Sequence, residues 1–266
     1  MMRNMSLSRS ASFIALGTML FCASFGIFAQ SARTAGASAK APVTVPFVGC
    51  ASDGQTGPTD PPLGKPHLVS IAPPLARQLA WYEASDGIGV LAPRGWHCFG
   101  VYGSNGSTLF VTPVPIDPNA PFSNNWKGFD GPAIQISVSV GGTSGRFAVA
   151  RMIARVFPEH MAFVRGVIAE RIEPATEFPR GPYPTDKLTY HGSEVVEYET
   201  PPQTTGLGTN SRLQKNDSPI RGVAMLGGAD TNLLQLSMRL PATMSALEDT
   251  IIQQTELESA SIPADN

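Results

Sequence analysis

The 266-residue chain has few charged side chains, and their sum is close to zero. Charged residues make up 15% of the sequence, and 19 basic against 21 acidic residues give a formal net charge of −2. A protein that binds the phosphate backbone of nucleic acid usually carries a clear excess of positive charge. The composition therefore argues against a nucleic-acid partner.

Side chains that bind transition metals are also scarce. The chain has four histidines, and no two of them have the spacing His-x3-His. Zinc sites combine several His or Cys ligands, commonly at short spacings. We therefore expect no metal and no other cofactor, and we interpret each histidine as a surface or hydrogen-bonded structural residue. The four are His67, His97, His160 and His191.

Long apolar runs are absent after the first 39 residues, and the run within them covers 13–29. Arg3 and Arg9 precede this run, and Ala37-Ser38-Ala39 follows it with small residues at alternate positions. This order predicts a secretory signal peptide over 1–39. An uncleaved anchor is the alternative, but the run is shorter than the roughly 20 residues that a spanning helix needs. We expect export to the periplasm or the medium, with no integral membrane segment in the mature chain.

Only three cysteines are present, and Cys22 would leave with the signal peptide. The remaining pair, Cys50 and Cys98, is typical of a single disulfide in an exported protein. Closing this loop would stabilise the fold by roughly 4 kcal/mol in the chain-entropy model. Two unpaired thiols are the alternative. The disulfide would attach the N-terminal segment to the first strands of the domain.

Composition divides the remaining chain into three parts. Residues 40–74 contain eight prolines, which disfavour helices and central strands, so we expect an irregular arm there. Residues 75–258 are predicted to form a single α+β domain, and 259–266 a disordered tail. Within the domain, the polar, glycine-rich stretch 201–219 is expected to be a mobile loop.

Strand signals dominate the predicted domain. Ile134, Ile136 and Val138 alternate with polar residues, which is the period of a half-buried strand. Asn105-Gly106 is a strong hairpin turn, and two later hairpins are expected over 187–198 and 221–240. Helices are predicted at 75–82, 147–157 and around 247–252, the last of them after the capping-box spacing Ser245-x-x-Glu248. Further strands are expected at 87–91, 96–102 and 109–112.

Two short motifs sit within this layout. Pro93-Arg94-Gly95-Trp96 forms the turn after an early strand, and Leu240-Pro241 precedes the last helix. From about residue 87 to 257 the chain resembles the PsbP-like family. The resemblance implies an α/β/α sandwich, in which helices pack on an antiparallel sheet, and a non-enzymatic accessory or binding role. The cysteine pair and the proline-rich arm are not part of that family pattern.

The junction Gly141-Gly142-Thr143-Ser144-Gly145-Arg146, between a strand and a helix, is one candidate site. Thr143 or Ser144 would cap the helix in the simplest interpretation. Alternatively, backbone N–H groups and Arg146 would bind an anion. A third possibility is a Ser144 nucleophile, although the junction lacks the Gly-x-Ser-x-Gly elbow.

Trp126 is the second candidate, because it lies in the polar segment 124–128, where an exposed tryptophan calls for a contact role. Aromatic faces stack on sugars, so the partner would be a glycan or an envelope protein. The leading functional hypothesis is an exported, non-enzymatic binding or accessory protein of the bacterial cell envelope. The alternative is an envelope serine hydrolase centred on Ser144.

Overall fold

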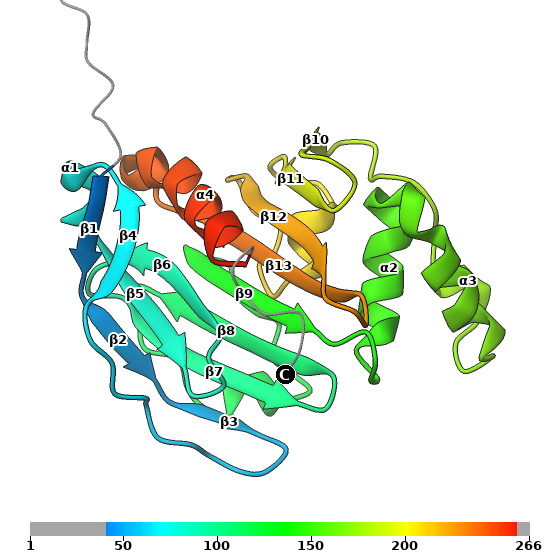
Figure 1. The fold of residues 1–266 in the computed structure, drawn as a ribbon, viewed down its shortest axis with the longest axis horizontal. Helices are drawn as coiled ribbons and strands as arrows, with labels where there is room; N and C mark the ends of the chain where they lie inside the picture. Colours follow the sequence, from blue (N-terminus) through cyan, green and yellow to red (C-terminus); the bar gives the residue numbers. More distant parts are fainter. Residues whose placement is uncertain (1–40, 260–266) are drawn as a thin grey trace, which may run out of the picture. The chain divides into compact units, whose positions relative to one another are not determined.

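The computed structural model describes residues 41–259 (Figure 1). The predicted signal peptide lies outside this range, as does the predicted tail apart from Ser259. Within 41–259 no helix is both long and apolar enough to span a membrane. The fold is mixed α+β, as the sequence predicted.

One eight-stranded sheet forms the centre of the structure, in the order β10-β11-β12-β13-β9-β8-β7-β3. All neighbouring strands are antiparallel except β3 and β7. The three predicted hairpins are confirmed as β7–β8, β10–β11 and β12–β13. The strands are β3 Ser52–Gly54, β7 His97–Gly103, β8 Gly106–Thr112, β9 Ala133–Ser139, β10 Lys187–Tyr190, β11 Val195–Thr200, β12 Ile220–Gly227 and β13 Asn232–Arg239.

The segment 40–74 is not an irregular arm, because it contributes four short strands. β1 (Ala41–Val45) pairs only with β4 (His67–Ile71), while β2 (Phe47–Cys50) and β3 each lie at a sheet edge. Edge strands tolerate proline because one side of their backbone needs no ladder hydrogen bonds. The proline content argued correctly against central strands, but it did not rule out strands at the edge of a sheet.

The predicted helix over 75–82 is also wrong. Only one helical turn, α1 (Pro73–Ala76), precedes β5 (Leu79–Ala84), which pairs with β2 and with β6 (Gly89–Pro93). Four consecutive buried residues, 79–82, begin β5. A short apolar run of this kind fits a buried strand as well as a helix, and periodicity does not separate the two.

The remaining helices cover both faces of the large sheet. α4 (Glu248–Ser259) packs against β12 and β13 on one face (Figure 1). On the other face, α2 (Arg146–Val156) packs against β9 and β13, and α3 (Met161–Ala169) packs against α2. The 3-10 helix η5 (Ala242–Leu247) precedes α4, and the predicted capping box is not formed, because Ser245 Oγ donates to the Ala242 carbonyl instead.

Two apolar cores lie on opposite faces of the sheet. The larger core joins α4 and the three-stranded sheet to residues such as Leu109, Ile136 and Leu236. The second core lies under α2 and includes Val196 and Leu233. Because successive side chains of a strand point to opposite faces, the strands between the cores serve both.

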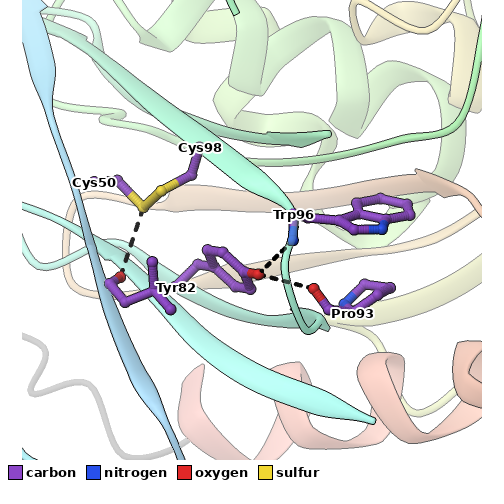
Figure 2. Close-up of a disulfide and its surroundings, with 6 residues drawn as sticks. Cys50, Tyr82, Pro93, Trp96 and Cys98 are labelled. Carbon is purple, nitrogen blue, oxygen red and sulfur yellow. Dashed lines mark hydrogen bonds between the residues drawn. A yellow bond between two sulfur atoms is a disulfide. The ribbon is translucent and has the colours of Figure 1, made fainter. Parts of the chain in front are cut away.

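The predicted disulfide between Cys50 and Cys98 is present (Figure 2). Cys50 ends β2 and Cys98 lies in β7, so the bond joins the three-stranded sheet to the large one. Close by, the buried Tyr82 hydroxyl donates to the Pro93 carbonyl at 2.8 Å and accepts from the Trp96 amide at 3.0 Å (Figure 2). These bonds fix the turn between β6 and β7.

The stretch 201–219 is packed into the protein, contrary to the expected mobile loop. It contains the 3-10 helix η4 (Leu207–Asn210), and Leu207 and Leu213 are fully buried. Asp186 accepts hydrogen bonds from the Leu207 amide and the Thr200 hydroxyl, which anchor η4 to β11. Two buried leucines in a mostly polar stretch were too few to produce a recognisable pattern.

Candidate functional site

The polar faces of β8, β9 and β13 lie side by side and form the floor of a cavity of about 650 Å³. Thr108, Gln135, Ser137 and Gln235 line this floor. Their apolar neighbours along the same strands point into the larger core on the opposite face. The polar residues whose alternation predicted a half-buried strand, β9, therefore face this cavity and not the open surface of the protein.

Segments from four other parts of the chain form the walls of this cavity. α2 contributes Arg151 and Arg155, the segment before β9 contributes Trp126, and the segment around η4 contributes Arg212. Tyr183 completes the wall beside α2. Among these residues only Trp126 carries a recognisable signal in the sequence.

A buried hydrogen-bond network fixes Gln235 in the floor. Its Nε2 donates to the Tyr198 hydroxyl and to the Leu207 carbonyl, both at 3.2 Å. The Tyr198 hydroxyl in turn lies 2.7 Å from Leu236 O and from Ser237 Oγ. Burial raises the pKa of Tyr198 to about 12, although the hydrogen bonds from Ser237 and Gln235 oppose the shift. The phenol therefore stays neutral at physiological pH.

Gln135 fixes the other side of the floor. Its Oε1 accepts from the Arg212 amide at 2.7 Å, which holds the segment after η4 against β9. The Arg212 guanidinium lies over the Trp126 ring, 5.3 Å from its centroid. Trp126 itself packs edge-on against Phe110 and Phe129. The indole is therefore half-buried in an aromatic cluster rather than freely exposed.

The wall formed by α2 carries two arginines, of which only one forms an ion pair with an acidic side chain. Arg151 forms an ion pair with Glu173, at 2.5 Å. Arg155 donates to the Gly181 carbonyl at 3.2 Å and lies over the Tyr183 ring, 4.1 Å from its centroid. The Tyr183 hydroxyl donates to Asn210 Oδ1 at 3.0 Å, which connects this wall to η4.

The charge of the cavity differs from that of the whole chain. Its charged lining residues are Arg151, Arg155, Arg212 and Glu177. Because Arg151 is paired with Glu173, the excess of positive charge comes from Arg155 and Arg212, in a protein of net charge −2. Low-dielectric walls strengthen the field of such groups inside a cleft. The cavity therefore favours anions.

The predicted junction site is occupied by contacts within the protein. The N-cap of α2 is Gly145, with no side-chain cap; Thr143 Oγ1 instead accepts from the Gly145 amide and donates to the Val140 carbonyl. Arg146 Nε donates to both carboxylate oxygens of Glu170, at 3.0 and 2.8 Å. Thr143, Ser144 and Arg146 do not line the cavity.

Ser144 is exposed, and no histidine between residues 41 and 259 forms a hydrogen bond with it. His67 stacks on Trp81 and bonds to Glu258, while His191 bonds to Glu197. The hydrolase alternative gains no support from this geometry.

One cluster of potential metal ligands occurs in the described part of the chain. His191, Glu197 and Glu256 each place a ligand atom within 4.8 Å of the others. His191 Nε2 is already hydrogen-bonded to Glu197 Oε1 at 2.9 Å and is half-exposed. Burial raises the pKa of Glu256, and the nearby Glu197 raises it further. We interpret this group as a network of hydrogen bonds and charges between β11 and α4.

Comparisons with protein-family models, curated proteins and solved structures found no match to this chain.

Proposed function

We propose that this protein is an exported, non-enzymatic binding protein that holds a small polar molecule in the cavity over β8, β9 and β13. The supporting observation is that α2 and three loop segments cover a polar sheet face and leave a cavity of about 650 Å³ above it. Ligand pockets typically measure 300–1,000 Å³. The cavity is of the size that a monosaccharide or disaccharide needs.

The floor also presents polar groups that have no protein partner. Among the described residues, no hydrogen bond uses Gln135 Nε2 or Gln235 Oε1, while the opposite end of each amide is held by the protein. Both residues are only 9% exposed. Neither atom is among the fully enclosed polar atoms that lack a partner, so both reach the cavity, where a bound polar molecule would form hydrogen bonds with them.

Export rests on the basic, apolar and small-residue order of 1–39, and the Cys50–Cys98 disulfide is consistent with an oxidising compartment. The ligand would then come from the periplasm or the medium, and a fragment of an envelope glycan fits both the location and the hydroxyl-lined floor.

Native mass spectrometry of the protein purified from its host's envelope fraction tests this function. We expect extra mass that survives native conditions and disappears on denaturation. Ser137→Phe places a large side chain on the floor and should abolish the extra mass. Thr189→Phe, on the exposed face of β10, is the matched control and should retain it. Extra mass that persists in Ser137→Phe would place the ligand elsewhere and contradict the proposal.

A further inference from the structure

We infer that the ligand is an acidic sugar, and that Arg155 and Arg212 bind its carboxylate or phosphate group. This inference rests on the proposed function, because it assigns a ligand class to the same cavity. It follows from three features of the two arginines: their missing acidic partners, their fixed positions and their place relative to the hydroxyl-lined floor.

Three other arginines of the described residues are paired with acids, whereas Arg94 and Arg239 donate to backbone carbonyls. Arg146 pairs with Glu170, Arg151 with Glu173, and Arg221 with both Glu248 and Asp249. In the described range neither Arg155 nor Arg212 has a carboxylate within 4.0 Å. Their charges therefore remain available to an anion.

Asp186 is the acid whose charge interacts with Arg155. Its carboxylate is engaged by the Thr200 hydroxyl at 2.8 Å and by the Leu207 amide at 2.8 Å. Asp186 therefore anchors η4 and leaves most of the Arg155 N–H groups without an acceptor. The bond to the Gly181 carbonyl uses only one of the five donors that a guanidinium carries.

Aromatic rings hold both guanidinium groups in place. Arg155 lies on Tyr183 and Arg212 lies on Trp126. Stacking leaves the edge of the guanidinium plane free for hydrogen bonds, and it reduces the conformational entropy lost on binding. A guanidinium edge matches the geometry of a carboxylate or a phosphate.

The two arginines belong to one continuous wall. Tyr183 donates to Asn210, and Asn210 lies two residues before Arg212 in the chain. All of these residues line the same cavity as the floor residues Thr108, Ser137 and Gln235. A ligand in contact with the wall and the floor would therefore carry an anionic group together with several hydroxyl groups, which describes a sugar acid or a sugar phosphate.

Isothermal titration calorimetry with three probes tests the inference: glucuronate, glucose 6-phosphate and glucose. Glucuronate and glucose 6-phosphate separate the carboxylate source from the phosphate source, and glucose is the neutral match for both. We expect at least one acidic probe to bind at least tenfold more tightly than glucose. Arg155→Gln and Arg212→Gln should each weaken that probe by ~10-fold or more, the loss expected for a charge-assisted hydrogen bond. Arg165→Gln, on the exposed face of α3, should not change its affinity.

Two results would overturn the inference while leaving the proposed function intact. In the first, glucose binds as tightly as both acidic probes, and Ser137→Phe abolishes the binding of glucose. The other is acidic-probe binding that Arg165→Gln weakens as much as Arg155→Gln and Arg212→Gln do. If none of the probes binds and the envelope protein carries no releasable mass, the proposed function fails together with the inference.

Discussion

Replacing Tyr198 with phenylalanine tests the buried network that supports the cavity floor. The hydroxyl lies within hydrogen-bond distance of Leu236 O, Ser237 Oγ and Gln235 Nε2. Tyr198→Phe leaves these buried polar groups without that partner, and an unsatisfied buried group costs about 1–3 kcal/mol. We expect the free energy of unfolding at pH 7 to fall by about that amount.

The same substitution predicts a pH dependence whose sign follows from the raised pKa of Tyr198, about 12 against an ordinary value of 10.0. Below pH 10 the phenol is neutral in both the folded and the unfolded chain, and its stabilising contribution is fully present. Between pH 10 and 12 the unfolded chain ionises first, so the contribution is lost as pH rises. At pH 11 the loss reaches about 1.4 kcal/mol.

Urea unfolding followed by tryptophan fluorescence at pH 9 and pH 11 measures this effect. The stability difference between wild type and Tyr198→Phe should narrow by about 1.4 kcal/mol over that interval. Tyr190→Phe, at a half-exposed site, controls for general alkaline destabilisation. A difference that stays constant from pH 9 to pH 11 would refute the reasoning, because Tyr198 would then titrate as it does in the unfolded chain.

Three further predictions concern stability. Cys50→Ser combined with Cys98→Ser should lower the free energy of unfolding by up to about 4 kcal/mol, and a urea midpoint equal to that of the oxidised wild type would contradict this. Leu207→Ala should cost about 2–5 kcal/mol because the side chain is fully buried, whereas a mobile segment would show almost no change. Burial raises the pKa of Glu256, so the stabilising contribution of this carboxyl is present at low pH and is lost as pH rises. Glu256→Gln should therefore raise the melting temperature at pH 7. The same substitution should have little effect on the melting temperature near pH 3.5.

Local patterns predicted the elements whose signals lie in consecutive residues. Asn105-Gly106 predicted the β7–β8 hairpin, and the alternation around Ile136 predicted β9. The same alternation did not reveal that Gln135 faces a covered cavity, because the cover consists of α2 and three distant loop segments. A polar strand face looks the same in sequence whether solvent or a cavity lies above it.

The remaining wrong predictions concern residues whose partners lie far away in the sequence. The strand nature of β2 depends on a parallel partner, β5, some thirty residues later, and no local pattern specifies such a pair. The alternative of an anion site at the junction requires a free Arg146, and its partner Glu170, which lies beyond the end of α2, could not be identified from the sequence. Arg155 and Arg212 carried no sequence signal, because only the fold brings them to the same cavity.

The position of α4 has a consequence for how the chain acquires its structure. The larger core is closed by Ile251 and Ile252, which belong to the last described element and cover strand residues such as Val223 and Leu236. A polypeptide that passes through a channel with its N-terminus first has no cover for this apolar face until residues 248–259 have emerged. For the exported protein proposed above, the larger core would therefore be completed only after residues 248–259 have crossed the membrane.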